Sequence, residues 1–159
     1  MRLIEVSHAA TTAALVGIVA LDPFAGMRSA PGWSDWLTRT QRLDRVMSRV
    51  APPLFLSAAA TALGATLLAP VHHEKLLAAG RGVATGATAA AIAVTLISND
   101  PLNVRIRQWR ASDIPPDDWR QVRAEWERGH NHRRGLITTA GAATLLGQLS
   151  VVRRRAAGG

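Results

Sequence analysis

The side chains that could do chemistry are concentrated in one stretch of the sequence, residues 99–134. The stretch holds eight of the nineteen basic residues, three of the five tryptophans and two of the five histidines. Imidazole and carboxylate groups ligate metals or move protons, and arginines bind anions. We therefore take residues 99–134 as the first place in which to look for a functional site.

A metal site is one chemistry that the histidines suggest. His130 and His132 are two residues apart, and Asp22 and Asp100 could supply carboxylate ligands. On a helix, residues two apart point away from each other, so a shared ion would need a non-helical backbone here. Iron or copper bound by such ligands is the metal-dependent alternative.

A second set of metal-ligating residue types lies near the start of the chain. Glu5 and His8 are three residues apart and would share a helix face, the spacing found in di-iron sites of helix bundles. His72, His73 and Glu74 follow in a later polar connection. A dinuclear site repeats the motif on several helices, whereas it occurs once here. The competing interpretation is that Glu5 and His8 are polar residues at a helix end.

The elements that would position these residues are four apolar, alanine-rich runs. A bilayer core of ~30 Å needs roughly 20 residues of helix, with a range of about 17–25. The first run has Glu5 where a signal peptide would have basic residues, so we interpret it as a span. The predicted spans are residues 3–24, 50–71, 82–98 and 135–152.

The sequence therefore predicts an all-α protein, a four-transmembrane-helix bundle in a single integral membrane domain, residues 1–159. Residues 99–134 form a polar, Trp- and Arg-rich helical cap between helices 3 and 4, and residues 153–159 form a basic tail. Hydrophobic residues make up 48% of the chain but aromatic residues only 4%. Such a composition suits helices that face lipid or pack closely on one another.

Two finer expectations concern the boundaries and contacts of the spans. A short amphipathic helix, residues 38–50, leads into the second span, which the chain enters through Pro52 and Pro53. In the third span, Gly82 and Gly86 have the four-residue spacing that lets helix backbones approach closely in lipid. These contacts would lie within one chain or between the copies of a homo-oligomer.

The charge distribution predicts a membrane partner and an orientation. The formal charge of +8 comes from eighteen arginines and one lysine, Lys75. Because the arginines flank apolar runs, we expect anionic lipid headgroups and no nucleic acid as the partner. Thirteen basic residues lie on the cap side and six on the other, which places the cap in the cytoplasm.

Heavy use of arginine and alanine is compatible with a multi-pass protein of a bacterial cell membrane. The absence of cysteine excludes thiolate-bound metals.

Tryptophan occurs on the cap side alone, at Trp33, Trp36, Trp109, Trp119 and Trp126. One interpretation is a one-sided belt of rings among the lipid headgroups. The other is that the two polar connections fold together into a lid whose rings line the mouth of a pocket.

The cap also contains the signature of a helix with one apolar face. Residues 115–118, two prolines followed by two acids, are typical of a helix start. From there Trp119, Val122, Trp126 and His130 recur at intervals of three and four. This spacing places them on one face, which we expect to pack on apolar side chains.

Several of these residues follow a family pattern. The pattern consists of Pro101-Leu102-Asn103 after the third span, Trp109, Pro116, Trp119, Arg123, Trp126 and a His/Asn-x-x-Arg element. Two pairings match the last element, His130 with Arg133 and Asn131 with Arg134, and the second fits the pattern better. With this pattern, the chain resembles the anthrone-oxygenase-like family of small four-helix membrane proteins, much of which is of unknown function.

The resemblance implies a membrane oxygenase that oxidises an anthrone-like aromatic or polyketide-type molecule with dioxygen, without an established cofactor. The hydrophobic substrate would enter from the bilayer. The catalytic candidates carried over are His130 as the base, Arg134 and Arg123 as groups that stabilise an anion, and Asn103 and Asn131 as groups that orient it. The substrate-binding candidates are Trp109, Trp119, Trp126 and Asp100, and the metal candidates are Glu5, His8 and His132.

Competing interpretations exist for single residues and for the whole protein. Asn103 could cap the third helix, and Arg134 could extend to lipid headgroups. The protein could be a non-catalytic membrane scaffold or subunit that docks a partner through its basic cap. A transporter is disfavoured because no predicted span carries a charge near its middle.

Overall fold

The computed structural model describes residues 2–20, 29–67 and 75–157. Its helices are α1 (Arg2–Ala20), α3 (Trp33–Leu67), α4 (Lys75–Val94), α5 (Asp100–Gln108) and α6 (Trp119–Ala157). The α4 and α5 helices are joined without a break by a π-helical turn, Thr95–Asn99. No strand occurs in these ranges, so the all-α prediction is confirmed.

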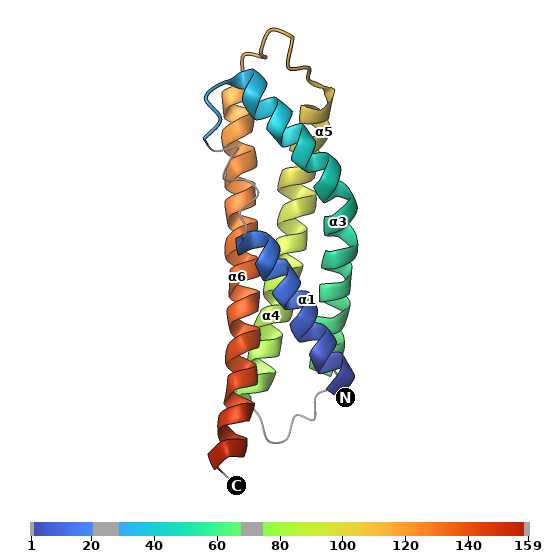
Figure 1. The fold of residues 1–159 in the computed structure, drawn as a ribbon, viewed down its shortest axis with the longest axis vertical. Helices are drawn as coiled ribbons and strands as arrows, with labels where there is room; N and C mark the ends of the chain where they lie inside the picture. The colour runs from blue at the N-terminus through green and yellow to red at the C-terminus, as the bar shows by residue number, and fades with distance from the viewer. Residues whose placement is uncertain (1, 21–28, 68–74, 158–159) are drawn as a thin grey trace.

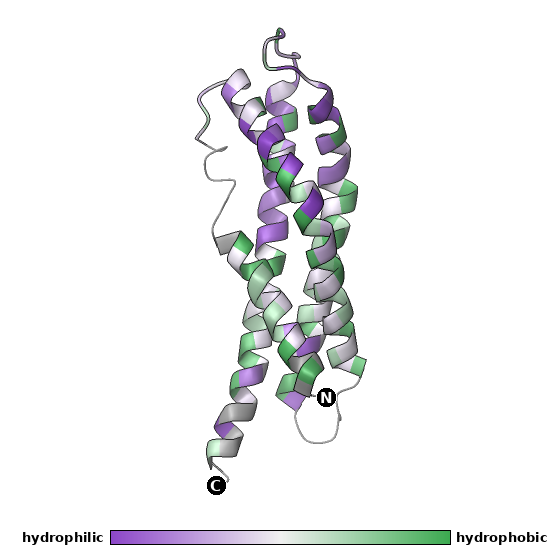
Figure 2. Ribbon diagram, turned by 45° about the vertical axis from the view of Figure 1, so that its right-hand side comes forward, coloured by the Kyte–Doolittle hydropathy of each residue, from purple (hydrophilic) through white to green (hydrophobic). Residues whose placement is uncertain are grey.

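The helices lie side by side in an elongated bundle (Figure 1). The start of α1 and the end of α6 lie at one end, and the loop between α5 and α6 lies at the other. Polar residues concentrate at the end with this loop, and apolar residues cover much of the remaining length (Figure 2). The loop, residues 109–118, contains turns but no helix.

Two helical runs are long and apolar enough to cross a membrane, Trp33–Leu67 and the continuous run Lys75–Gln108. By length and composition alone, a core helix of a soluble protein passes the same test. In each of these two runs, however, only 22% of the apolar 18-residue segment that could cross the membrane is buried inside the protein. Leu56 and Ile97, for example, are 68% and 76% exposed. Such outward apolar surface is typical of contact with lipid or with another protein, and the four membrane spans stay predictions.

The helix that carries the second predicted span does not begin at its two prolines, contrary to expectation. Pro52 and Pro53 lie inside α3, which continues the arginine-rich segment into the apolar one without a break. A proline has no N–H group to donate to the preceding turn, so a helix with internal prolines tends to kink. Figure 1 shows α3 changing direction along its length.

The cap is not a separate unit. It consists of α5, the loop 109–118 and the first turns of α6, which then runs on into the predicted fourth span. The α6 helix begins at Trp119, whose N–H group donates to the carbonyl of Pro116 at 3.0 Å. Long continuous helices therefore carry the polar side chains beyond the apolar part of the bundle.

The five tryptophans pack against one another at the polar end. The ring centroids of Trp33 lie 5.2 Å from Trp109 and 5.6 Å from Trp119. Those of Trp36 lie 6.1 Å from Trp119 and 6.3 Å from Trp126. Trp36 is fully buried. Of the two interpretations, this geometry matches two polar connections folded together and not a belt of separate rings.

Glycine permits close helix contact at positions other than those expected. A Cβ atom on Gly80 would lie 2.7 Å from the carbonyl oxygen of Ala143, so α4 and α6 meet backbone to backbone there. Gly82 and Gly86 have nothing within 4 Å of such an atom and are exposed. The contact expected of their four-residue spacing is therefore not made within the chain, and a contact between copies of the chain stays a prediction.

Candidate functional site

A large cavity lies between α3, the run from α4 to α5, and α6. Its volume is about 490 Å³, within the range of about 300–1,000 Å³ typical of small-molecule pockets. The polar part of its lining includes Asp44, Asp100, Asn103, Arg107, His130 and Arg133. The apolar part includes Leu43, Met47, Phe55, Leu56, Ile92 and Leu96.

His130 is the histidine that faces this cavity. Its side chain is buried, and its ring lies over Trp126 with 3.7 Å between the centroids. Its Nδ1 atom lies 2.8 Å from the carbonyl oxygen of Trp126. A carbonyl can only accept a hydrogen bond, so this contact is a hydrogen bond in the tautomer that carries its proton on Nδ1, and Nε2 is then the proton-accepting nitrogen.

Asn99, the last residue of the π-helical turn, contacts the same ring nitrogen of His130. Its Nδ2 atom lies 2.9 Å from Nδ1 of His130 and 3.3 Å from the carbonyl oxygen of Trp126. Its Oδ1 atom is buried and has no hydrogen-bond partner. Rotation of the carboxamide by half a turn would bring this oxygen to Nδ1 of His130, but it would also set the oxygen against the carbonyl oxygen of Trp126 and move Nδ2 to the buried place that has no partner.

Burial sets the protonation states in the cavity. Burial and, to a smaller extent, the charge of Arg133 lower the pKa of His130 to about 3, against the opposing effect of the Trp126 carbonyl. Burial also lowers the pKa of Arg133, to about 10. At neutral pH the cavity thus contains a neutral imidazole and a cationic guanidinium.

Two polar pairs fix the wall of the cavity on the α5 side. Asn103 accepts a hydrogen bond from Nε1 of Trp126 at 2.8 Å, and it lies within the helical run, so the cap interpretation does not apply. Arg107 forms a bidentate ion pair with Asp44 of α3, with distances of 2.6 and 3.0 Å. This geometry is the stronger form of an arginine–carboxylate contact.

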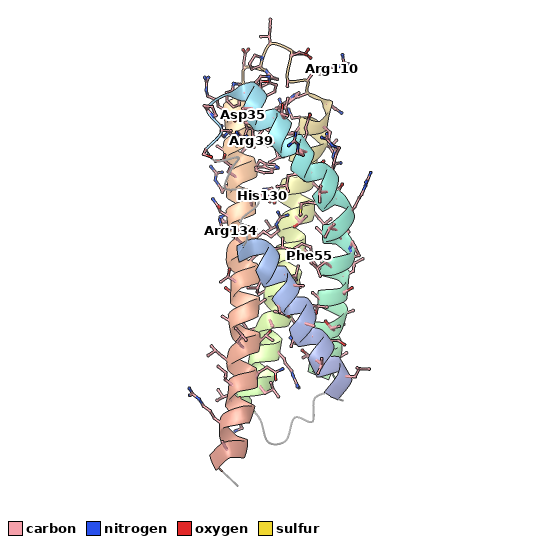
Figure 3. The ribbon with its side chains drawn as sticks, viewed as in Figure 1. Asp35, Arg39, Phe55, Arg110, His130 and Arg134 are labelled. Atoms are coloured by element: carbon pink, nitrogen blue, oxygen red, sulfur yellow. The ribbon has the colours of Figure 1, made fainter. Side chains whose placement is uncertain are left out.

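The structure separates the two pairings of the His/Asn-x-x-Arg element. His130 and Arg133 both line the large cavity, whereas Asn131 is exposed. Arg134 lines a second cavity of about 50 Å³ between α1, α3 and α6. In Figure 3, His130 and Arg134 lie one above the other along α6.

Three other candidates lie in the core or the rim of the tryptophan cluster and not in the cavity. Arg123 bonds to Glu127 at 2.8 Å and to the carbonyl of Ala30 at 3.2 Å. Trp109 and Trp119 pack on the cluster. Among the tryptophan candidates, Trp126 lines the large cavity.

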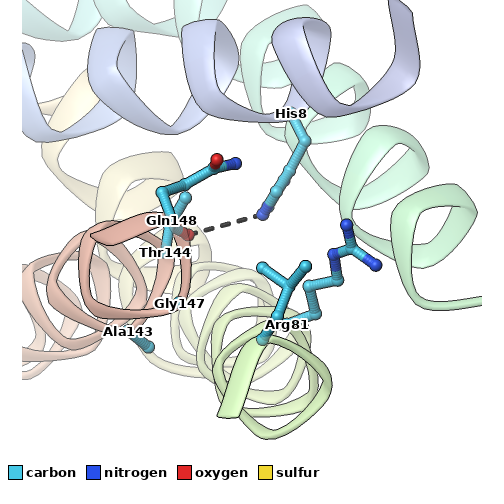
Figure 4. Close-up of a pocket in the computed structure, with 7 residues that line it drawn as sticks. His8, Arg81, Ala143, Thr144, Gly147 and Gln148 are labelled. Carbon is cyan, nitrogen blue, oxygen red and sulfur yellow. Dashed lines mark hydrogen bonds between the residues drawn. The ribbon is translucent and has the colours of Figure 1, made fainter. Parts of the chain in front are cut away.

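Of the metal candidates, His8 and His132 are described, and these two are not brought together. His132 is exposed, while His8 is buried at the other end of the bundle, its Nε2 atom 3.4 Å from the hydroxyl of Thr144 (Figure 4). Within the described ranges, no three His, Asp or Glu side chains form a group that could hold a metal ion. The side chain of Glu5 and the whole of Asp22, His72, His73 and Glu74 lie outside the described residues.

Sequence reasoning missed several residues that line the cavity or contact its lining. Asp44 and Arg107 are far apart in the chain and pair only in the folded protein. Asn99 was taken as the boundary of a span, although it is fully buried against His130. A polar residue directly after an apolar helical run was the available signal.

The described part of the chain is thus a small all-helical protein with a ligand-sized cavity that is polar at one end. The sequence model described as anthrone oxygenase matches residues 43–144. This match covers more than half of the chain, and the chain belongs to the anthrone oxygenase family. Every residue that lines the large cavity falls within the matched range. No curated protein and no solved structure matches the chain.

Proposed function

We propose that this protein is a membrane-embedded oxygenase that oxidises a hydrophobic, anthrone-like aromatic molecule with dioxygen in the large cavity. The observation that supports it best is the lining, in which a neutral His130 and a cationic Arg133 stand at the polar end of an apolar wall. Family membership points to the same reaction.

The first step is removal of a proton from the activated ring carbon of the substrate. Nε2 of His130 accepts the proton, and Arg133 stabilises the enolate that forms. In the substrate-free cavity, burial and the charge of Arg133 disfavour imidazolium. A bound anion compensates that charge, so proton transfer becomes favourable only with the substrate in place. Asn103 and Trp126 hold the aromatic rings in position.

The overall oxidation balances without a further reductant. The substrate CH₂ group loses two hydrogen atoms and becomes a carbonyl, while one oxygen atom of dioxygen enters this carbonyl and the other leaves as water. The substrate supplies all four electrons that dioxygen takes up. The chemistry thus needs a base, an anion site and protection from bulk water, and a buried cavity of this type offers all three.

A membrane location fits this chemistry, because the substrate would dissolve in the bilayer. Leu56 and Leu96 line the cavity and are also 68% and 63% exposed, so the cavity opens on the apolar outer surface. In the proposed arrangement α1, α3, the continuous run from α4 to α5, and α6 all span a bacterial cell membrane, and the tryptophan cluster lies on the cytoplasmic side. A substrate can then enter from the lipid between α3 and the π-helical turn.

The experiment that tests the function is dioxygen uptake on a simple anthrone by the detergent-purified protein, together with metal analysis. We expect uptake with one dioxygen per anthrone. His130→Ala should lower kcat by roughly 100-fold or more, and Asn103→Ala and Arg133→Ala should abolish turnover without unfolding the bundle. Asn131→Ala, at an exposed position of the same helix, is the matched control.

Three other outcomes would change the proposal. Normal turnover in His130→Ala would remove the proposed base. Stoichiometric iron or copper would favour the metal-dependent alternative and direct attention to Glu5 and His8. A metal-free protein without uptake would favour a scaffold that docks a partner through its basic end.

A further inference from the structure

The large cavity has a smaller neighbour. This inner cavity has a volume of about 50 Å³ and lies between α1, α3 and α6. Resting on the function proposed above, we propose that the inner cavity is a dioxygen compartment that supplies the oxidant to the substrate cavity from the side of α1.

The two cavities share a wall. Met47, Ala51 and Phe55 of α3 and Arg133 of α6 line both of them. The separation between the cavities is therefore one layer of side chains thick. Met47 is unbranched and flexible, so small rotamer changes can open the wall to a diatomic molecule while an aromatic ring system stays on its own side.

The size and lining of the inner cavity suit dioxygen. A cavity of about 50 Å³ is too small for an anthrone but large enough for a diatomic gas. Leu15 and Ile18 of α1 and Ile137 of α6 supply much of its apolar surface. Arg133 and Arg134 line it as well, and the remaining, apolar lining is of the kind that binds apolar gases. Dioxygen is itself apolar and concentrates in apolar media, such as the lipid beside α1.

Arg133 and Arg134 can stabilise the anions that form where the two cavities meet. The substrate enolate gives one electron to dioxygen, which becomes superoxide while the enolate becomes a neutral radical. The two then combine through a new C–O bond, and the resulting peroxide anion takes the proton from His130. Loss of water breaks the O–O bond and leaves the carbonyl. Arg133, which faces both cavities, and Arg134, which faces the inner one, lie where the anionic oxygen species form.

The first test needs no turnover. Xenon is an apolar atom that occupies dry protein cavities, and it should shift the methyl NMR signals of Ile18 and Ile137 in the detergent-solubilised protein. Ile97, which is 76% exposed, is the reference for non-specific contact. Shifts at Ile18 and Ile137 no larger than that at Ile97 would overturn the compartment.

The second test is kinetic. Ile18→Phe fills the inner cavity and should raise KM for dioxygen at least about fivefold while KM for the anthrone stays unchanged. Ile92→Phe, which narrows the large cavity alone, should raise KM for the anthrone and leave KM for dioxygen unchanged. Ala14→Phe, at an exposed position of α1, controls for the added ring and should change neither.

The outcomes separate the two proposals. If the wild-type protein turns over and Ile18→Phe keeps its KM for dioxygen, the compartment is wrong and the oxygenase stands. If the wild-type protein shows no uptake, the oxygenase is wrong, and with it the supply of dioxygen. Should Ile18→Phe fail to fold, the xenon shifts of the wild-type protein decide.

Discussion

Nδ2 of Asn99 lies 2.9 Å from Nδ1 of His130, and this contact joins the π-helical turn to α6 at the polar end of the large cavity. A π-helical turn inserts one extra residue into a helix and is frequent at functional sites. Here the inserted turn carries Asn99 inwards, where it is fully buried. The orientation of the proposed base thus depends on a local irregularity in the neighbouring helix.

Gly129 leaves the room that this contact needs. A Cβ atom at this position would lie 2.8 Å from both Nδ2 and Oδ1 of Asn99. Because Asn99 must then shift, Gly129→Ala should lower turnover strongly. The gain in helix propensity, about 1 kcal/mol, should offset part of the cost in stability. Turnover and thermal unfolding in detergent measure the two effects.

Gly135→Ala is the matched control on the same helix. Nothing lies within 4 Å of a Cβ atom there, so this variant should be as stable as the wild type or up to about 1 kcal/mol more stable, with normal turnover. Equal turnover in Gly129→Ala and Gly135→Ala would show that Asn99 does not position His130.

The lowered pKa of His130 makes stability depend on pH. In the unfolded chain the ring takes up a proton below about pH 6.5, whereas in the folded protein its pKa is about 3. Between these values the unfolded state binds more protons, so stability falls as the pH falls, by about 1.4 kcal/mol per pH unit. Unfolding of the wild type and of His130→Gln, measured from pH 7 to 4, isolates this contribution.

The curve for His130→Gln should therefore be flatter than that of the wild type, and the two should diverge as the pH drops. Parallel curves would mean that the imidazole is already accessible to water and protonated in the folded state. The same lowered pKa predicts that kcat/KM has no acid limb near pH 6.5 that belongs to His130.

The sequence was sufficient for the fold class and for one face of α6. The spacing of Val122, Trp126 and His130 predicted a buried face, and all three side chains are buried. The choice between Arg133 and Arg134 could not follow from spacing, because neighbouring residues on a helix differ by roughly 100° in direction. Only the register of α6 against α3 decides which arginine faces the large cavity.

The contacts that α4 makes with the other helices of the chain were predicted less well. Small residues occur around much of α4, and composition does not say which of them face a partner helix. Gly80 makes the close contact, while Gly82 and Gly86 face outwards. The π-helical turn further shifts the phase of everything after Val94, so a constant period read from the apolar run cannot place Asn99 or Asn103.

Arg133 and Arg134 should differ in their effect on His130. The charge of Arg133 contributes to the lowered pKa of His130, so Arg133→Gln should raise that pKa, although burial will keep it below the ordinary value. Arg134 is not among the causes of the shift, and Arg134→Gln should leave the pKa of His130 unchanged. NMR titration of histidine-labelled protein measures both, and an equal rise in the two variants would contradict the assignment of Arg133 to the cavity.

The membrane arrangement can be tested because the chain contains no cysteine. Ser112 lies exposed in the loop between α5 and α6, and Ala156 lies exposed near the end of α6. If α6 spans the membrane with the tryptophan cluster inside, a membrane-impermeant maleimide should label Ala156→Cys in intact cells and should label Ser112→Cys only after the cells are opened. The reverse pattern would invert the orientation. Labelling of both positions in intact cells would mean that α6 does not cross the bilayer, and the substrate would then have to reach the cavity from water.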